Sequence, residues 1–176
     1  DRKLKGDAGI AQQAFVDAGG SILAFSADIL SKADLIVDGL LGTGVSSDVD
    51  SVFGHVIDEV NQVATLANTP IVSIDLPSGM NANTGQPLGR CVQAAVTVTF
   101  VGVKPGLVTG IGKHYCGHLV FDDLGIGEAF QAIAKSQASI ISLFAFNPPA
   151  PRQTHSTKGN LDACCVSAVT KAQGAL

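Results

Sequence analysis

The chain has 176 residues, of which 46% are hydrophobic and 15% are charged, and its formal net charge is −4 at pH 7. This composition is typical of one folded domain with a sizeable core. A negative charge without a run of Lys or Arg argues against nucleic-acid binding. No apolar run reaches the ~18 residues of a bilayer span, so we expect no membrane partner.

The predicted elements alternate between helices and strands along the chain. An amphipathic helix at 6–18 ends at two glycines, and a helical or extended segment follows at 21–31. Hydrophobic patterns then predict a strand at 35–41, a helix at 52–68, a strand beginning at 71, and strands at 95–103 and 118–126. This order predicts an α/β fold with a Rossmann-like, doubly wound, mostly parallel sheet and flanking helices in three layers. Strand order does not follow from the sequence.

Two of the predicted strands end on an acidic residue. Asp38 follows an apolar run in DLIVDGLLGTG, and Asp75 follows another in IVSIDLPSG. Because the carboxyl ends of parallel strands meet at one edge of a sheet, we expect both carboxylates there. Asp75 suits an acid or base, although an Asp before a Pro-Ser-Gly turn can also cap free amides. Ser78 suits a ligand of a hard cation or a turn residue, and no GxSxG elbow surrounds it.

A Gly-Thr-Gly turn at Gly42 to Gly44 follows the first of these strands. Glycines let backbone amides approach a phosphate and accept positive φ, and a following helix adds partial positive charge. An ordinary strand-to-helix turn is the alternative, because neither GxGxxG nor GxxxxGK[ST] is present. Lys104 in VGVKPGL could meet a phosphate, although a lone lysine is more often solvated.

The remaining chemically active residues show no metal or nucleophile pattern. The four histidines, at 55, 114, 118 and 155, have no partner at i+3 or i+4 and are interpreted as structural or surface residues. The four cysteines, at 91, 116, 164 and 165, lack CxxC spacing. We therefore expect reduced thiols and a cytoplasmic protein.

The segments DLIVDGLLGTG, SIDLPSGMNANTG, VTFVGVKPGL and YCGHLVFDDLGI together resemble the NAD(P)H-hydrate epimerase family, or YjeF N-terminal domain, over about residues 3–126. The resemblance implies a Rossmann-like enzyme that interconverts the R and S epimers of hydrated NADH and NADPH, called NADHX and NADPHX. It implies a potassium ion on Asp38 and Ser78, and Asp75 as the catalytic acid or base that contacts substrate. It also implies substrate contacts from the loop residues Gly42, Thr43, Gly44, Val45, Ser46, Ser47 and Asp48.

The chain departs from the family pattern near its start. The family also uses an Asn-Asn-Gly-Gly-Asp-Gly segment for phosphates and one potassium ligand, and this chain begins after the position of that segment. We therefore expect residues 1–146 to be a partial epimerase domain that lacks its first strands. Low activity, lower stability and an exposed face are the expected results.

A proline-rich linker is predicted at 147–152, with a domain boundary near Pro148. In bifunctional relatives an ADP- or ATP-dependent hydrate dehydratase follows such a linker. Arg152, His155 and Lys158 with the next two residues resemble its opening, so residues 153–176 are interpreted as the start of a truncated dehydratase domain. Such a parent protein would be a lyase as well as an isomerase.

Two other functions remain open on the sequence. A non-enzymatic nucleotide-binding or interaction module would keep the fold without turnover, and the absent Asn-rich segment favours it. A nicotinamide-dependent oxidoreductase is disfavoured because the GxGxxG fingerprint is absent. The partner in the leading interpretation is a small dinucleotide, and a homo-oligomer is compatible with the family.

The final residues, LDACCVSAVTKAQGAL, do not resemble the glycine-rich strand and loop that open a dehydratase. For one choice of codons, a shift of one base makes this stretch read FGRVLCVGGNKGAGG, which has those features. We hypothesise that the reading frame shifts after Asn160. Sequencing the gene across the codons for Lys158 to Ala163 should reveal the shift, and one uninterrupted, well-supported frame would contradict it.

Overall fold

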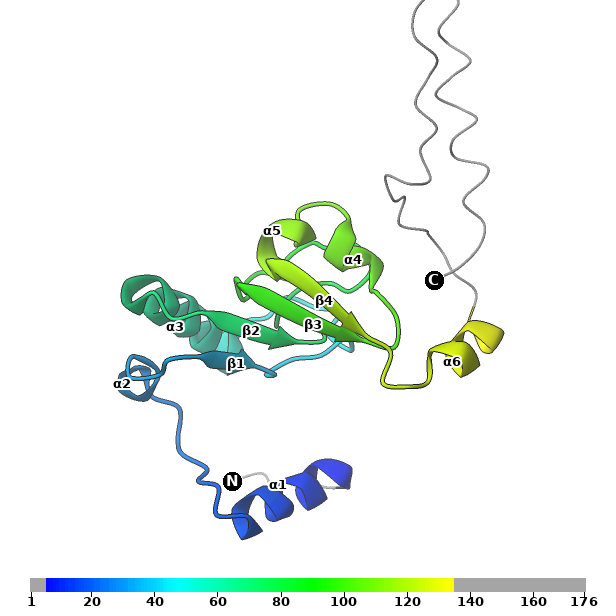
Figure 1. Ribbon diagram of the computed structural model, residues 1–176. Helices are drawn as coiled ribbons and strands as arrows, with labels where there is room; N and C mark the ends of the chain where they lie inside the picture. The colour runs from blue at the N-terminus through cyan, green and yellow to red at the C-terminus, as the bar shows by residue number, and fades with distance from the viewer. Residues whose placement is uncertain (1–5, 135–176) are drawn as a thin grey trace, which may run out of the picture.

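The structure is a computed structural model that describes residues 6–134 (Figure 1). Its centre is a parallel sheet of four strands in the order β1-β2-β3-β4. The strands are β1 (Ile36–Asp38), β2 (Ile71–Ile74), β3 (Val96–Phe100) and β4 (His118–Asp122). The helices are α1 (Asp7–Asp17), α2 (Ala27–Leu30), α3 (Ser51–Ala67), α4 (Pro105–Val108), α5 (Gly112–Cys116) and α6 (Gly127–Ile133). The predicted Rossmann-like α/β class is confirmed.

Every predicted helix and strand has a counterpart, but the strands are shorter than predicted. The chain leaves the sheet after Asp38, whose side chain accepts a hydrogen bond from the Leu40 amide at 3.4 Å. β3 ends before Val101, which takes a positive φ of 64°. After β4, the Asp122 carboxylate accepts a bond from the Leu124 amide at 2.8 Å and begins a turn. Local side-chain and backbone turns therefore end strands that hydrophobicity alone would extend.

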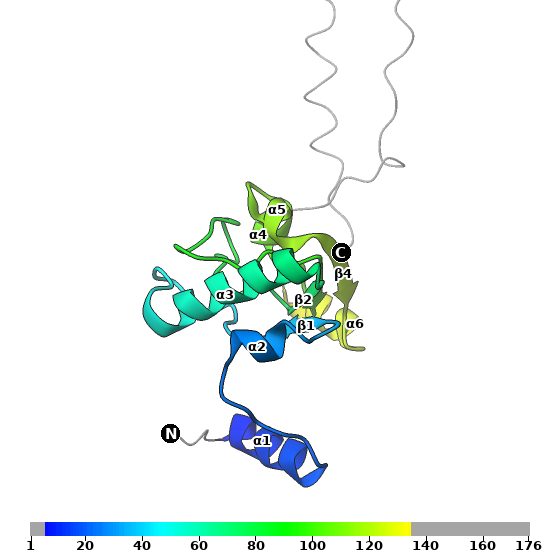
Figure 2. The ribbon, with the colours of Figure 1, turned by 90° about the vertical axis from the view of Figure 1, so that its left-hand side faces the viewer.

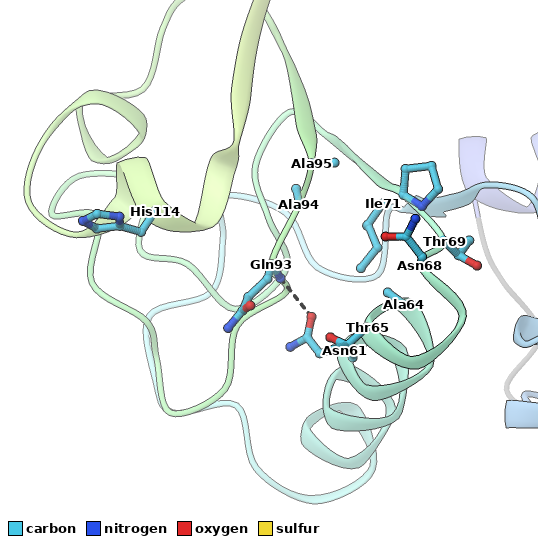
Figure 3. Close-up of a pocket in the computed structure, with 11 residues that line it drawn as sticks. Asn61, Ala64, Thr65, Asn68, Thr69, Ile71, Gln93, Ala94, Ala95 and His114 are labelled. Carbon is cyan, nitrogen blue, oxygen red and sulfur yellow. Dashed lines mark hydrogen bonds between the residues drawn. The ribbon is translucent and has the colours of Figure 1, made fainter.

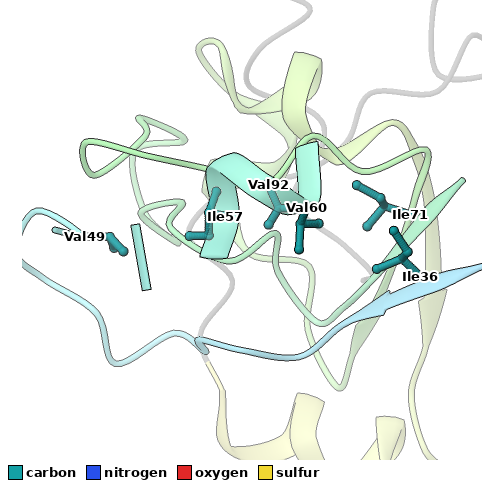
Figure 4. Packing of buried hydrophobic residues seen from close by; sticks show 6 residues of the cluster. All are labelled: Ile36, Val49, Ile57, Val60, Ile71 and Val92. Atoms are coloured by element: carbon teal, nitrogen blue, oxygen red, sulfur yellow. The ribbon is translucent and has the colours of Figure 1, made fainter. Parts of the chain in front are cut away.

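Helix α3 covers one face of the sheet (Figure 2). Ile57 and Val60 lie one turn apart on α3 and are 0% and 5% exposed. They belong to one apolar cluster with Ile36 of β1 and Ile71 of β2, together with Val49 and Val92 (Figure 4). The spacing of three residues gives α3 the apolar stripe that this packing needs. The helix ends at Asn68, which caps it in the left-handed region at φ 54°.

A second apolar cluster packs the segments beside α4 and α5. Its buried members are Leu76, Met80, Cys91, Leu107 and Cys116, each at most 6% exposed. It joins the turn after β2 to the short helices between β3 and β4. The turn after β2, which carries candidate site residues, is therefore packed against this second cluster.

The other face of the sheet carries apolar side chains that remain accessible. Register places Val37, Ile74 and Val120 on this face, and they are 60%, 43% and 39% exposed. Helix α1 has no buried residue and lies apart from the sheet (Figures 1 and 2). Among the described residues, these side chains of the sheet are therefore only partly covered.

Within residues 6–134, no helix is both long and apolar enough to cross a membrane. The predicted linker at 147–152 and the tail at 153–176 lie outside the described residues, as do His155, Cys164 and Cys165.

Replacing Ile57 by Ala should lower the free energy of unfolding by about 2–5 kcal/mol, because it empties the centre of the α3 cluster. Leu66→Ala on the same helix is the matched control, since Leu66 is 79% exposed and its loss should cost less than about 0.5 kcal/mol. Urea unfolding of both variants measures the difference. Equal midpoints would contradict the packing described.

Candidate functional site

The carboxyl ends of β1, β2 and β3 bring three charged residues to one edge of the sheet. Asp38 is the last residue of β1 and Asp75 is the first after β2. Lys104 follows β3 and immediately precedes α4. The placement of Asp38 and Asp75 agrees with the expectation from parallel strands.

The carboxylate of Asp38 is buried and holds four donors. Its side chain is 2% exposed. Oδ2 accepts hydrogen bonds from the Ser73 hydroxyl at 2.7 Å and the Ser78 amide at 2.9 Å. Oδ1 accepts a bond from the Ser78 hydroxyl at 2.5 Å and a long one from the Leu40 amide. Asp38 therefore ties β1 to β2 and to the Leu-Pro-Ser-Gly turn.

That turn depends on a glycine after Ser78. Gly79 has φ +91°, and a Cβ placed on it would lie 1.9 Å from the carbonyl oxygen of Arg90. Only glycine fits both the backbone angle and the close approach. Ser78 itself is 0% exposed, which agrees with the sequence-based rejection of a serine nucleophile.

Two oxygens and one backbone amide surround the hydroxyl oxygen of Ser78. Its Oγ lies 2.5 Å from Asp38 Oδ1 and 3.3 Å from the Leu41 carbonyl oxygen, and it accepts a bond from the Leu41 amide at 2.9 Å. Within the described residues, no Lys, Arg or His lies at ion-pair distance from Asp38. Buried carboxylates normally have a counter-charge, and an all-oxygen donor set suits a hard cation. The residues present therefore fit a monovalent or other hard cation at Asp38 and Ser78.

The Asp75 carboxylate is held differently. Its Oδ1 accepts hydrogen bonds from the Thr99 hydroxyl at 3.1 Å and the Phe100 amide at 3.2 Å, and forms an ion pair with Lys104 Nζ. Its side chain is 29% exposed. The backbone of Asp75 takes φ 68°, an angle that Asp tolerates better than most residues. β3 and Lys104 thus fix a carboxylate that still reaches solvent.

Burial raises the pKa of Asp75. Hydrogen bonds from Lys104, Phe100 and Thr99, together with the positive charge of Lys104, lower it by more, so that the pKa lies below 3.8. Such a carboxyl group stabilises the fold above its unfolded pKa, and that contribution is lost as pH falls through the folded pKa. Asp75 is therefore an anion at neutral pH. In this state it can accept a proton but cannot donate one.

The pairing of Lys104 with Asp75 was not predicted. The sequence interpretation of a solvated lysine is wrong, because the Lys104 side chain is only 20% exposed and contacts a carboxylate. The available signal was its place just after the third strand, since that position meets the same sheet edge as the two acids.

The loop from Gly42 to Asp48 is open. Its residues are exposed except Val45, which is half-buried against the α3 cluster. Neither glycine uses positive φ, and neither would clash if it carried a Cβ, so the predicted need for glycine is not seen here. Within the described part of the chain, the amides of 42–48 donate no hydrogen bond. They are thus available to a ligand.

The end of this loop is anchored. The Val49 amide donates to the Leu88 carbonyl at 2.7 Å. Arg90 bonds Asp50 at 3.0 Å and Asp58 at 2.6 Å on the solvent side. Helix α3 begins at residue 51, close to its predicted start at 52, and residues 45–50 separate it from the Gly-Thr-Gly turn.

A shallow pocket of about 600 Å³ lies away from these residues. It opens at the amino ends of β2 and β3, between Asn61 of α3 and His114 of α5 (Figure 3). The Gln93 amide donates to Asn61 Oδ1 at 2.9 Å across its rim. None of the predicted site residues lines it, so this pocket and the charged sheet edge are separate features.

The cysteines and histidines add no second centre within residues 6–134. Cys91 and Cys116 are free and buried, and burial together with the Asp38 charge raises the pKa of Cys91 to about 12. His55, His114 and His118 are exposed. No group of three His, Cys, Asp or Glu side chains in the described residues could hold a metal ion, which leaves the oxygen cluster at Ser78 as the cation candidate.

The family model and the similar proteins found by comparison all point to one family. Residues 1–106 match the family model described as YjeF-related protein N-terminus. The chain is 35% identical over 156 residues to the bifunctional NAD(P)H-hydrate repair enzyme Nnr of Coxiella burnetii, covering 87% of this chain and 31% of that protein. It is 40% identical over 126 residues to the Nnr protein of Escherichia coli, covering 72% and 24%.

A shorter relative is the NAD(P)H-hydrate epimerase of Limosilactobacillus fermentum. The chain is 43% identical to it over 98 residues, which cover 55% of this chain and 45% of that protein. The chain therefore spans less than a third of the bifunctional relatives it matches and under half of this single-function one.

Asp38→Asn should destabilise the fold by about 1–3 kcal/mol, because an amide nitrogen would face a buried donor that now meets a carboxylate oxygen. Asp34→Asn is the control, since Asp34 is exposed and precedes the same strand. Chemical denaturation at neutral pH compares the two. A variant as stable as the wild type would show that the Asp38 network does not hold the strands together.

Proposed function

The chain belongs to the family of YjeF-related protein N-termini, and from this membership we propose that it carries NAD(P)H-hydrate epimerase activity. The reaction is the interconversion of the R and S epimers of NADHX and NADPHX, the hydrated forms of the reduced nicotinamide cofactors. The relatives named above carry epimerase or repair-enzyme names, and Asp38, Ser78 and Asp75 meet at one sheet edge. That meeting of two carboxylates is the observation that carries the proposal.

Asp75 is the proposed catalytic residue. Epimerisation of a carbon that bears a hydroxyl beside a ring nitrogen can proceed by loss and return of that hydroxyl, and a positioned carboxylate can move its proton. Oδ1 of Asp75 is already bound by Thr99 and Phe100. The same side chain is 29% exposed, so it can bind its protein partners and still meet a substrate.

We place a potassium ion at Asp38 and Ser78. When bound, the ion supplies a fixed positive charge that organises the site without redox chemistry. Asp38 Oδ1 accepts a bond of 2.5 Å from the Ser78 hydroxyl and a long one from the Leu40 amide, whereas Oδ2 accepts bonds from the Ser73 hydroxyl and the Ser78 amide. A cation bound at Oδ1 would therefore also contact the Ser78 side-chain oxygen.

The exposed loop is the proposed substrate-binding segment. It comprises Gly42, Thr43, Gly44, Val45, Ser46, Ser47 and Asp48. Its unused amides suit the phosphates of a dinucleotide, because backbone N–H groups are favourable donors to anions. The Val49–Leu88 bond anchors one end of the segment, which limits the ordering cost when a ligand binds.

Family membership also suggests the parent protein, its location and its assembly. We assign the chain to a bifunctional parent whose second activity is an ADP- or ATP-dependent dehydratase, so that ADP or ATP belongs to that second domain. A cytoplasmic location suits the free thiols of Cys91 and Cys116. Assembly into a homo-oligomer stays a prediction.

Asp75→Asn should lower kcat for epimerisation of R-NADHX by about 10²–10⁴-fold, because the amide cannot carry the proton. The assay follows epimer ratios with potassium present, for this chain and for a form extended upstream by the Asn-Gly-rich family segment. Asp34→Asn is the control and should match the wild type. Replacing potassium by sodium should lower turnover in both forms.

Full activity of Asp75→Asn would refute Asp75 as the catalytic residue. Dinucleotide binding without turnover in either form would refute the epimerase proposal and favour a nucleotide-binding module. Turnover confined to the extended form would support the proposal, because that segment supplies the remaining phosphate contacts.

A further inference from the structure

The ammonium group of Lys104 has no free donor. Nζ donates to Asp75 Oδ1, to the Phe100 carbonyl oxygen at 2.9 Å and to the Thr99 hydroxyl oxygen at 3.3 Å. A lysine ammonium has three N–H groups. All three are thus directed at the β3 strand end and at Asp75, which leaves none for a substrate phosphate.

The three partners hold Lys104 from different directions. Phe100 and Thr99 belong to β3, while Asp75 follows β2. Lys104 is followed by Pro105, which fixes the backbone at the start of α4. A side chain that is 20% exposed and held in this way is a fixed charge rather than a solvated one.

The two oxygens of Asp75 are consequently unequal. Oδ1 accepts from Lys104, from the Thr99 hydroxyl and from the Phe100 amide. Among residues 6–134, Oδ2 accepts no hydrogen bond. One oxygen is fully engaged by protein, and the other keeps its lone pairs for an incoming molecule.

We propose that Lys104 is a positioning residue: it holds Oδ1 of Asp75 and so presents Oδ2 as the atom that exchanges a proton with the substrate. This inference rests on the proposed catalytic role of Asp75. No bond to Lys104 forms or breaks in the reaction. Its effect is to fix the orientation of the carboxylate and to favour the anion.

The effect of the Lys104 charge on the pKa of Asp75 has a sign that can be measured. Burial alone would raise the pKa of Asp75, and Lys104 is the first of the groups that lower it. Removing the ammonium leaves burial with less opposition, so the pKa must rise. If the reaction requires the Asp75 anion, its rate then falls at a higher pH than in the wild type as the solution is made more acidic.

The test compares Lys104→Met, Lys104→Arg and the control Lys32→Met in the full chain. Lys32 is exposed and lies between α2 and β1, far from this network in sequence. Lys104→Met should lower kcat by on the order of 100-fold, as expected for a misplaced catalytic group, and should move the acid limb of the pH profile upward. Lys104→Arg should recover part of the rate and move the limb back, and Lys32→Met should change neither.

A second measurement is independent of turnover. Carbon-13 NMR of labelled aspartate, with the Asp75 signal assigned by its loss in Asp75→Asn, gives the titration of that carboxyl group directly. We expect Lys104→Met to move this titration to higher pH. The arginine variant should titrate close to the wild type.

The two proposals fail in different ways. An unmoved Asp75 titration in Lys104→Met would overturn the role of Lys104, whatever happens to activity. Equal activity of the wild type and Asp75→Asn would overturn the catalytic role of Asp75, and with it the positioning role, even if the titration moves. A rate loss in Lys104→Met with an unchanged acid limb and no rescue by arginine would indicate a purely structural lysine and would also overturn the inference.

Discussion

The structure depends on a buried carboxylate that, within residues 6–134, is satisfied by hydrogen bonds and has no cationic side chain beside it. Asp38 joins the end of β1 to Ser73 of β2 and to the amide and hydroxyl of Ser78. Without these donors, a charge 2% exposed would be strongly unfavourable. The same bonds fix the turn after β2 and place Ser78 at this sheet edge.

The two carboxylates have different surroundings, which suit the separate roles proposed for them. Asp38 is enclosed by neutral donors within a core, whereas Asp75 lies beside a fixed ammonium and reaches solvent. A negative group among neutral donors attracts a cation, while one paired with a lysine already has its counter-charge. One sheet edge can thus combine a cation site and a proton-transfer group without the two carboxylates competing for the same partner.

The sequence predicted the features that follow from periodic patterns, and it missed those that depend on individual contacts. The α3 stripe and the acids at the ends of β1 and β2 follow from periodicity and parallel topology, so both were predictable. The contact of Lys104 with Asp75 was not, because it joins residues 29 positions apart through the register of β2 and β3. The early ends of β1 and β3 were also missed, since they depend on a side-chain bond at Asp38 and a positive φ at Val101.

The consecutive order of the strands bears on how the chain acquires its shape. Each strand from β2 to β4 pairs with the strand that precedes it in the sequence, so the sheet can grow in the order of synthesis. Pairing with the next strand in sequence closes a shorter loop than pairing with a more distant strand would, and so lowers the entropic cost of loop closure. The Asp38–Ser78 bonds join segments that leave the ribosome before β3 and β4 do.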